Sequence, residues 1–474
     1  MAHIPLPGAD QAAAAGRLSV AAVPPERELT FEHLPEPVIT VLNTIADAGH
    51  EVTLVGGCVR DRLLELEPIE DWDAATSARP EEVTKLFGDA TWENRFGTVT
   101  IGRDPAVEVT SYRAEGDYRD RRRPDDVRFG VSLTDDLARR DFTVNAMAWM
   151  PVDLRERTGT LVDPFGGAQD LADRLLRTVG DPRERFTEDA LRLVRAARFA
   201  GRFEMVIDPA TEAAIAELAP TVATVSHERV RDELLRILRL DPRPSRALHT
   251  LEGFGLMAPL FPELAALRGI PQSKAIPGDA LDHTLAAVDA VPTGQTELRL
   301  AALLHDLGKA TTLGDDHFIG HDTVGADLAA ALLERLRVPG SIANRIVGAI
   351  RHHMYDYDSA WTDAAVRRFI RRTADVDSEL LFGLRRADNA ASGVGARGDE
   401  NQAELEARMG RELEGQPELL LHRRLAIDGH DLQRELGMEP GPQIGELLDR
   451  LTEAVLDDPG LNDRSSLLAL ARQR

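Results

Sequence analysis

The sequence predicts an α+β protein in which a small mixed sheet near the N-terminus is followed by a long all-α remainder. Segments typical of strands stand at 52–55, 96–101 and 107–112, where residues are apolar throughout or alternate with polar ones. Segments with the apolar spacing of helices separate them. After Asp163 the strand signals vanish, and the apolar residues follow helical spacing to the end of the chain.

Length and composition place broad limits on the protein. The chain has 474 residues, enough for about two to four domains. No apolar run approaches the ~20 residues of a membrane span, and residues 1–25 lack the basic and apolar segments of a secretory signal. The single cysteine, Cys58, excludes an intramolecular disulfide, so we expect a reducing, cytoplasmic location without membrane or disulfide-linked partners. Cys58 itself is interpreted as a small buried residue rather than a nucleophile.

The net charge is −24, from 56 Lys and Arg against 80 Asp and Glu. This balance argues against non-specific binding of nucleic acids. The positive charge is almost all arginine and is clustered, however, so a local basic cleft on an acidic body is compatible with the sequence. The segment 113–123 interleaves both charges with few apolar residues, which indicates a mobile surface loop whose arginines can reach RNA phosphates.

Several elements follow from local pattern alone. Residues 1–33 are rich in Ala, Pro and Gly without apolar periodicity, which predicts a mobile leader. Helical spacing appears from Pro37 to Gly49, near 80–87 and at 133–137. These helices alternate with the predicted strands, as expected for a small α/β head.

A glycine turn joins the first strand to a helix. The strand at 52–55 runs into Gly56 and Gly57 and then into a helix over 59–66. Glycines at such a turn let backbone N–H groups approach a phosphate, and Arg60 can fork onto phosphate oxygens from the first helical turn. An isolated Gly-Gly pair is more often an ordinary turn.

Three carboxylates follow on predicted strands. Asp71 and Asp73 are two positions apart, so on a strand both side chains point to the same face. Glu108 shares a strand face with Thr110 and is in a position to complete a triad. Converging carboxylates are the hard oxygen ligands that Mg²⁺ accepts beside substrate phosphates. An isolated Asp-x-Asp is usually a solvated strand end, but beside a phosphate cradle it favours nucleotidyl transfer.

The motifs together resemble a known family. Residues 56–61 (Gly-Gly-Cys-Val-Arg-Asp), the Asp-Trp-Asp at 71–73 and the run 139–146 (Arg-Arg-Asp-Phe-Thr-Val-Asn-Ala) resemble the tRNA nucleotidyltransferase/poly(A) polymerase family, within the polymerase-beta-type nucleotidyltransferases. The resemblance spans about 34–270, with motifs in the family's order. It implies a head at 34–158 in which the catalytic, Mg²⁺-binding residues are Asp71, Asp73 and Glu108 and the nucleotide is bound by Gly56, Gly57, Arg60, Arg140 and Asp141.

A further polar set stands in a helical neck and body predicted at 159–270. Asp189, Arg192, Arg195 and Arg198 recur at every third position and predict one stripe along a helix. A solvated salt-bridge stripe is the simpler interpretation. The functional one is chemical: a carboxylate that accepts from an exocyclic amine, beside an arginine that donates to a ring nitrogen, suits cytosine and adenine. Uracil and guanine would leave those groups unpaired.

The resemblance extends to this stripe. In the CCA-adding enzymes of the class that the sequence resembles, Glu-Asp-x-x-Arg selects the nucleotide, and here that motif is 188–192. It implies that Asp189 and Arg192 act as a protein template for C and A. Arg195 and Arg198 are then left for phosphates and orientation.

Histidines and aspartates form a second candidate site. His283, the pair His305-Asp306 and Asp388 lie on helical patterns, and imidazole with carboxylate suits Mn²⁺, Fe, Ni or Zn. The set resembles an HD-type phosphohydrolase domain at 271–395, followed by a helical tail at 396–474. By analogy with family members that carry this domain, its substrate would be a cyclic or terminal phosphate on RNA ends. Two more histidines could extend the site to two metals: His321 and His353.

These observations predict an enzyme that adds the 3′-terminal CCA to tRNA from CTP and ATP. Alternatives are a poly(A) polymerase, an enzyme that adds only CC or only A, or an HD-type phosphohydrolase whose head only binds RNA. A non-catalytic RNA-binding scaffold is a further alternative. The absence of an Arg-rich insert before Phe96 favours CCA addition over poly(A) synthesis.

Overall fold

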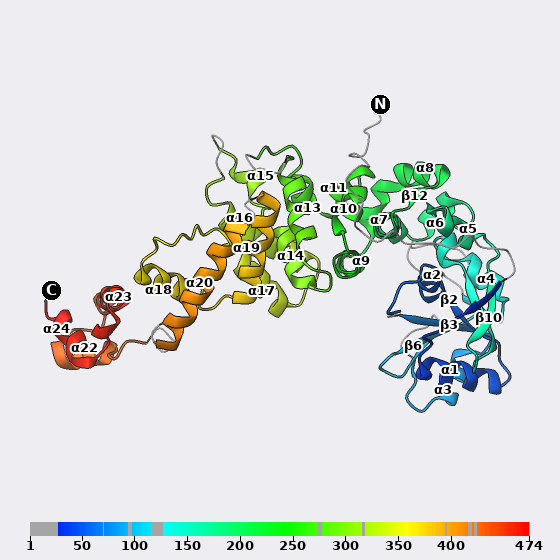
Figure 1. The fold of residues 1–474 in the computed structure, drawn as a ribbon, viewed down its shortest axis with the longest axis horizontal. Helices are drawn as coiled ribbons and strands as arrows, with labels where there is room; N and C mark the ends of the chain where they lie inside the picture. The colour runs from blue at the N-terminus through cyan, green and yellow to red at the C-terminus, as the bar shows by residue number, and fades with distance from the viewer. Residues whose placement is uncertain are drawn as a thin grey trace. The chain divides into compact units, whose positions relative to one another are not determined.

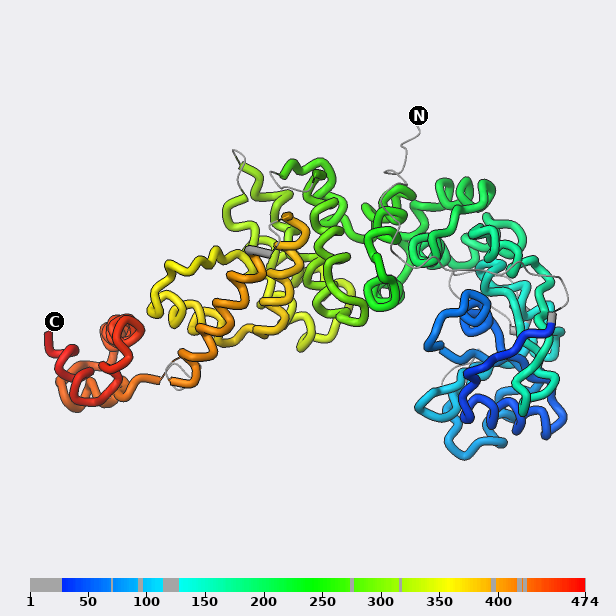
Figure 2. Tube along the Cα trace, in the orientation of Figure 1, coloured from blue at the N-terminus to red at the C-terminus, as the bar shows by residue number. Residues whose placement is uncertain are grey.

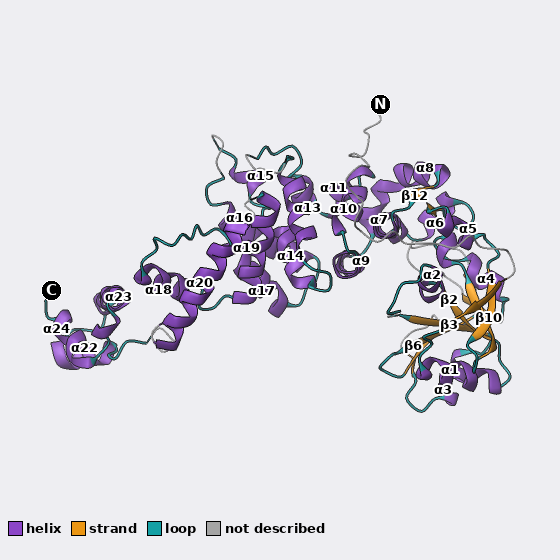
Figure 3. Cartoon of the chain, in the orientation of Figure 1, coloured by secondary structure: helices purple, strands orange, loops and turns teal. Residues whose placement is uncertain are grey.

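A computed structural model describes residues 27–69, 71–92, 97–115, 127–272, 277–314, 318–393, 396–415, 420 and 424–473. The chain divides into two compact units, Met1–Val225 with Phe254–Leu256, and Ser226–Gly253 with Met257–Arg474. All strands named among the described residues lie in the first unit, and the second is built from helices (Figure 3). The predicted α+β class with an all-α remainder is confirmed.

The first unit is organised around one mixed sheet of eight strands in the order β1-β10-β9-β2-β3-β6-β5-β4. Every neighbouring pair is antiparallel except β3 and β6, which run parallel. The strands β2, β5 and β6 were predicted from sequence, as was the carboxylate strand at 71–73, which corresponds to β3. The bounds are β1 Arg27–Thr30, β2 Val52–Val55, β3 Trp72–Thr76, β4 Thr91–Trp92, β5 Thr98–Ile101, β6 Val107–Ser111, β9 Ala148–Asp153 and β10 Thr158–Val162.

Helices cover both faces of this sheet. Helices α1 (Glu36–Asp47) and α3 (Pro80–Leu86) lie on one face, and α2 (Gly57–Leu63) lies on the other (Figure 1). Helix α1 turns an apolar stripe inward, as its spacing predicts. The glycine turn therefore lies on the face of the sheet that α2 covers.

The prediction of a mobile leader up to residue 33 is wrong for its last part. Residues 27–30 form the edge strand β1, which pairs with β10. The indole Nε1 of Trp149 donates to the carbonyl oxygen of Leu29 at 2.7 Å, and Phe31 packs edge-on against the Trp149 ring at 5.0 Å. Composition could not show this because the partner strand lies far along the chain. The predicted head boundary at 158 falls at the start of that same partner strand, and residues 1–26 lie outside the described part.

Short elements complete the first unit. The predicted loop at 113–123 begins as strand β7 (Arg113–Glu115), paired with β8 (Val127–Phe129), and its residues from 116 onward lie outside the described part. The remaining elements are α4 Leu133–Ala138, η1 Thr143–Asn145, α5 Gly167–Ala172, β11 Leu175–Leu176, α6 Pro182–Glu188, α7 Leu191–Phe203, β12 Val206–Ile207, α8 Pro209–Leu218 and η2 Ala219–Thr224.

The second unit is a stack of helices. Helices α13, α14, α17 and α19 contact one another around a common core, and α20 follows α19 along the chain (Figure 2). No helix among the described residues is both long and apolar enough to cross a membrane. The bounds are α9 His227–Leu240, α10 Pro244–Gly253, α11 Met257–Leu260, α12 Pro262–Ala265, α13 Ala280–Ala290, α14 Thr296–Leu304, α15 Lys309–Thr312, α16 His321–Arg335, α17 Gly340–His352, α18 Asp363–Arg372, α19 Ser378–Ser392, α20 Ala396–Gly415, α22 Gly429–Leu436, α23 Pro442–Asp457, η3 Pro459–Leu461 and α24 Arg464–Ala471.

Buried polar contacts attach the C-terminal helices to this core. The guanidinium of Arg367 on α18 donates to the carbonyl oxygen of Leu456 at 2.7 Å and to Glu412 at 2.9 Å. The hydroxyl of Tyr355 donates to Oε1 of Gln402 on α20 at 2.5 Å, and both side chains are buried. Helix α20 is therefore docked by specific hydrogen bonds as well as by apolar packing.

We expect Gln402→Leu to lower the free energy of unfolding by about 1–3 kcal/mol, because it leaves the buried Tyr355 hydroxyl without its acceptor. Urea denaturation followed by circular dichroism measures this. The double variant Tyr355→Phe/Gln402→Leu removes both polar partners and should recover most of the loss. A Gln402→Leu protein as stable as wild type would show that this bond does not hold α20.

Candidate functional site

The predicted catalytic carboxylates gather at one edge of the sheet. Strands β3 and β6 run parallel, with Asp73 in register with Glu108. Paired residues of neighbouring strands lie on the same face, and Asp71 precedes Asp73 by two positions. Asp71 and Glu108 are exposed, and Asp73 is half-buried. Accessible carboxylates that share a face are the donor set that Mg²⁺ accepts.

The glycine turn lies at the end of β2, the strand next to β3. Gly56 has φ +73°, and a Cβ added there would lie 2.6 Å from Nη1 of Arg140. Only glycine therefore lets this arginine lie against the turn. The Arg140 guanidinium also faces Asp136 at 3.5 Å, while its buried Nε has no hydrogen-bond partner. A cation with an unused donor beside an open backbone turn suits a phosphate.

Arg60 has a different environment from the one that a phosphate ligand requires. Its side chain is buried, with 5% of the residue exposed. Nη1 donates to Oδ1 of Asn145 at 2.6 Å, and Nε donates to Oδ1 of Asp61 at 2.8 Å. Its guanidinium carbon also lies 4.7 Å from the ring centroid of Phe203 on α7. Arg60 therefore bridges α2 to α7.

Asp141 is likewise engaged by protein groups. Its Oδ2 accepts from Nε of Arg195 at 2.7 Å, and its Oδ1 accepts from the amide of Asn145 at 3.1 Å. Burial by itself would raise the pKa of Asp141, but Arg195 and the hydrogen bond from Asn145 hold it well below the usual value. Asp141 is therefore a permanent anion that joins the 139–146 motif to α7.

The predicted template lies at a break between two helices rather than along one. Helix α6 ends at Glu188, and Asp189 is extended at φ −149° and ψ 103° before α7 begins. Asp189 is thus not part of the helical stripe, and its Oδ1 accepts from the backbone N–H of Leu191 at 3.1 Å. The N-cap of α7 is Ala190, so Asp189 lies between the two helices and belongs to neither.

The arginines that follow are not a solvated stripe. Arg192 and Arg198 are buried. Nη1 of Arg192 donates to Glu188 at 2.6 Å and Nη2 donates to the carbonyl oxygen of Arg139 at 3.0 Å, so its guanidinium is held in one orientation. The guanidinium carbon of Arg198 lies 4.2 Å from the centroid of the Phe199 ring. Sequence analysis placed Glu188 and Asn145 inside motifs but did not assign them as the partners of Arg192 and Arg60.

Cys58 is buried, as predicted. Its Sγ faces the carbonyl oxygen of Val55 at 3.4 Å. Burial raises the pKa of the thiol to about 12, and the nearby Asp73 adds to this. The neutral thiol is a weak nucleophile, so Cys58 is a packing residue at the base of the glycine turn.

The second unit brings all six predicted HD residues together. Among the described residues, two groups have ligand atoms within 4.8 Å of one another: His283 with His305 and Asp388, and His305 with Asp306 and His353. The rings of His321 and His353 are 5.4 Å apart, and His321 Nε2 lies 3.5 Å from Asp306. They come from α13, α14 and its following turn, α16, α17 and α19.

The histidines are oriented for a metal. Nδ1 lies within 2.8 Å of a carbonyl oxygen three residues earlier in His305, His321 and His353, which sets the tautomer that leaves Nε2 as an acceptor. The Nε2 atoms of these residues and of His283 are buried and make no hydrogen bond of normal geometry. Buried orphan acceptors that converge with carboxylates fit a transition metal.

Three features of this centre were not predicted. Lys309 is buried and its Nζ lies 2.6 Å from both Asp306 and Gln272. Arg385 donates to Asp388 at 3.1 Å. A Cβ at Gly308 would lie 2.2 Å from the carbonyl oxygen of His321, so a glycine is needed for α16 to approach the His-Asp pair. Gly308 and Lys309 belong to the run His-Asp-Leu-Gly-Lys at 305–309, which was the available signal for Lys309.

Burial and neighbouring charges shift the pKa values of groups in this centre. Burial works against the charged forms, yet His305 and Lys309 hold the pKa of Asp306 well below its usual value. Burial lowers the pKa of His353 to about 4, helped by the neighbouring His305. His353 is therefore neutral near pH 7, the form that coordinates a metal.

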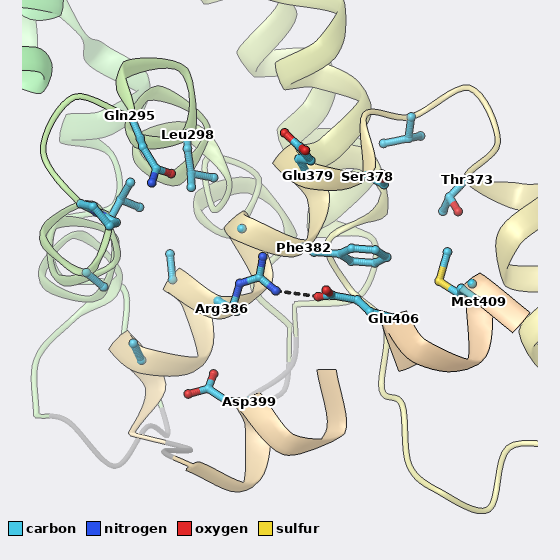
Figure 4. Close-up of a pocket in the computed structure, with 18 of the residues that line it drawn as sticks. Gln295, Leu298, Thr373, Ser378, Glu379, Phe382, Arg386, Asp399, Glu406 and Met409 are labelled. Atoms are coloured by element: carbon cyan, nitrogen blue, oxygen red, sulfur yellow. Dashed lines mark hydrogen bonds and ion pairs between the residues drawn. The ribbon is translucent and has the colours of Figure 1, made fainter. Parts of the chain in front are cut away.

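A separate pocket of about 990 Å³ lies between α19 and α20. Phe382 and Met409 contribute to its walls, and Arg386 pairs with Glu406 across it at 2.5 Å (Figure 4). On a helix, Arg386 and Asp388 point to opposite sides, so α19 separates this pocket from the metal centre.

The fold and these two sites define a polymerase-beta-type nucleotidyltransferase head combined with an HD-type metal centre. Four family models match the chain: Poly A polymerase head domain at 52–177, Probable RNA and SrmB- binding site of polymerase A at 204–267, HD domain at 281–393, and tRNA nucleotidyltransferase domain 2 putative at 402–471.

Relatives extend over most of the chain. An A-adding tRNA nucleotidyltransferase from Deinococcus radiodurans is 35% identical over 424 residues, covering 85% of this chain and 90% of that protein. A CCA-adding enzyme from Geobacillus stearothermophilus is 32% identical, covering 93% and 97%. The crystal structure of the Bacillus stearothermophilus CCA-adding enzyme in complex with CTP matches with a TM-score of 0.70 and 28% identity, covering 93% and 97%. The chain belongs to the tRNA nucleotidyltransferase/poly(A) polymerase family, which confirms the predicted resemblance.

We expect Cys58 to be inert toward Ellman's reagent at pH 8 in the folded protein, because its thiol is buried and its pKa is about 12. One equivalent should react once the protein is unfolded in urea. Rapid stoichiometric labelling of the native protein would contradict the packing role.

We expect the purified protein to bind a divalent transition metal and Asp388→Asn to weaken that binding. Loss of a carboxylate charge removes one ligand without changing the side-chain volume. Isothermal titration calorimetry with Mn²⁺ measures it, and Asp399→Asn on α20, which lines the separate pocket, is the matched control. Equal affinities for wild type and Asp388→Asn would exclude Asp388 as a ligand.

Proposed function

We propose that the protein adds the 3′-terminal CCA to tRNA, using CTP and ATP as substrates. The observation that carries this proposal is the in-register pair Asp73 on β3 and Glu108 on β6. Strand β3 neighbours β2, and the glycine turn follows β2. A cation held by these two carboxylates would lie next to a phosphate bound at the turn, as nucleotidyl transfer requires. Relatives named as CCA-adding enzymes over almost the whole chain support the choice of tRNA.

Asp71, Asp73 and Glu108 would hold Mg²⁺ at the sheet edge. Their accessibility and shared face fit a hard cation that keeps water and substrate oxygens among its ligands. When bound, Mg²⁺ activates the RNA 3′-hydroxyl and stabilises the negative charge on the pyrophosphate leaving group. The role of the protein is to hold the three carboxylates close together, with Asp73 and Glu108 on the paired strands β3 and β6.

The triphosphate would lie against Gly56, Gly57 and Arg140. The Gly56 N–H donates to the carbonyl oxygen of Met147 at 3.1 Å, so the N–H of Gly57 would be the one offered to a phosphate, and Arg140 lies against the same turn. Asp141 accepts a hydrogen bond from Arg195 and thereby holds the 139–146 segment beside α7. We propose Arg198 and Arg195 as orienting residues rather than direct phosphate ligands, because both guanidinium groups contact the Phe199 ring.

Nucleotide selection would rest on Asp189 and Arg192. The carboxylate accepts from the exocyclic amine of C or A, and the guanidinium donates to the adjacent ring nitrogen. Glu188 and the Arg139 carbonyl oxygen hold Arg192 before the nucleotide arrives, so little reorganisation is required. Uracil and guanine would present a donor to the guanidinium and an acceptor to the carboxylate, which are mismatched pairs.

Addition of A alone is the second candidate. The observation in its favour is the Deinococcus radiodurans relative, named as an A-adding enzyme, at 35% identity. Asp189 and Arg192 would serve both activities, so the site geometry does not separate them. The direct assay below does.

The HD centre would provide a second, metal-dependent activity. Four Nε2 acceptors with Asp306 and Asp388 suit Mn²⁺, Fe, Ni or Zn better than Mg²⁺. We propose hydrolysis of a cyclic or terminal phosphate on an RNA end, which would prepare the 3′-hydroxyl that the head requires. Lys309, held on Asp306, would keep that carboxylate ionised.

The first test is nucleotide addition with Mg²⁺ on tRNAs that end before CCA, after C and after CC. Each is offered every single NTP and then CTP with ATP. We expect CC followed by one A, with UTP and GTP refused. A product of A alone on the CC-ending tRNA would establish the A-adding alternative, and a long A tail would indicate a poly(A) polymerase.

We expect Asp73→Asn to reduce kcat for nucleotide addition by at least about 100-fold, because it removes a charge from the site where transition-state charge is stabilised. The double variant His305→Ala/Asp306→Ala should keep addition and lose metal binding at the HD centre. Retained addition in Asp73→Asn, measured on gels with labelled CTP, would exclude the proposed cation site.

A further inference from the structure

We propose that Arg60 is a positioning residue for nucleotide selection, which fixes α7 against the glycine turn of the head. This inference rests on the proposed nucleotidyl transfer and deepens it. Sequence pattern assigns Arg60 to the triphosphate, whereas its contacts connect two other parts of the site. Two independent links support the positioning role.

The first link is a relay of hydrogen bonds. Arg60 donates to Oδ1 of Asn145 at 2.6 Å, and the Asn145 amide donates to Oδ1 of Asp141 at 3.1 Å. The other carboxylate oxygen of Asp141 accepts from Arg195 on α7 at 2.7 Å. Because Asn145 donates with one end and accepts with the other, its orientation is set by both neighbours. The relay therefore runs from α2 to α7.

The second link is aromatic. The guanidinium carbon of Arg60 lies 4.7 Å from the centroid of Phe203 and 5.3 Å from that of Phe199, both on α7. These two rings stack with centroids 6.0 Å apart, and Phe142 meets Phe199 edge-on at 5.7 Å. A desolvated guanidinium is attracted to aromatic faces, so this contact restrains the helix.

The same side chain reaches the turn. A Cβ at Gly57 would lie 3.7 Å from Nη2 of Arg60, which places the guanidinium against the turn from inside the protein. Arg192 precedes Arg195 by one helical turn, so a shift of α7 carries Arg192 with it. Arg60 thus sets the distance between the place where the triphosphate would lie and the side chain that would select the base.

Arg140 is better suited than Arg60 to hold the triphosphate. Arg60 is 5% exposed, and Asp61 and Asn145 already take hydrogen bonds from its guanidinium. Arg140 lies against Gly56, retains a buried Nε without a partner, and has 17% of its side chain exposed. Arg140 therefore fits the phosphate-binding role and Arg60 the positioning role, whereas sequence pattern alone assigns phosphate binding to both.

The test is Arg60→Met, which keeps side-chain length but removes the relay and the charge. We expect the ratio of kcat/KM for CTP to that for UTP, on a tRNA ending before CCA, to fall at least about 10-fold, equivalent to about 1.4 kcal/mol. KM for CTP should change less than about three-fold. Arg60→Lys should restore the ratio only in part, because an ammonium cannot fork or stack as a guanidinium does.

Arg62→Met is the matched control. It lies on the same helix but donates to the carbonyl oxygen of Thr30 and leaves α7 untouched, so the ratio should equal that of wild type. If Arg60→Met fails to fold, judged by circular dichroism, Phe203→Leu removes the aromatic link alone and should lower the ratio in the same direction.

Two outcomes would overturn the inference and are distinguishable. A raised KM for CTP and ATP with an unchanged CTP to UTP ratio would make Arg60 a triphosphate ligand. Unchanged kinetics in both Arg60→Lys and Phe203→Leu would leave it with a purely structural role. Wild-type protein that adds no nucleotide to any of the tRNAs would instead reject the proposed function itself.

Discussion

The first unit depends on an ion pair between Asp141, which is buried, and Arg195, which is partly exposed. Asp141 ends the Arg-Arg-Asp motif beside the sheet, and Arg195 lies on α7, the helix that follows the proposed template. An unpaired charge at either position would be costly in this environment, so each holds the other in place. Asn145 and Arg60 extend the pair to the glycine turn. The proposed phosphate-binding and base-selecting parts are therefore held together by one set of contacts.

The two candidate centres meet different demands with different chemistry. In the head, carboxylates on paired strands remain accessible, as a cation shared with a large substrate requires. In the HD centre, imidazoles are buried and oriented by backbone carbonyl oxygens, which prepares a rigid set of nitrogen ligands. The hard, open centre suits Mg²⁺, and the closed nitrogen-rich one suits a transition metal.

Packing around each centre is as specific as the ligands. Gly56 leaves room for Arg140, and Gly308 lets α16 approach the His-Asp pair, so the two glycines admit neighbouring groups rather than provide flexibility alone. On α19, Asp388 faces the metal centre while Arg386 faces the pocket toward α20. Helix α19 therefore lies between the candidate metal centre and the C-terminal helices of the second unit.

The sequence by itself determined the class of fold, the strands β2, β5 and β6, the helix α1 and the identity of most residues in both candidate sites. These depend on local periodicity and on motifs whose members are close along the chain. It could not show that residues 27–30 form an edge strand, because that pairing is made with β10, far along the chain. Only the tertiary structure decided that Asp189 stands at a helix break, that Arg192 is held by Glu188, and that Arg60 contacts α7. Each of these depends on burial and on partners brought together by folding, which local pattern does not encode.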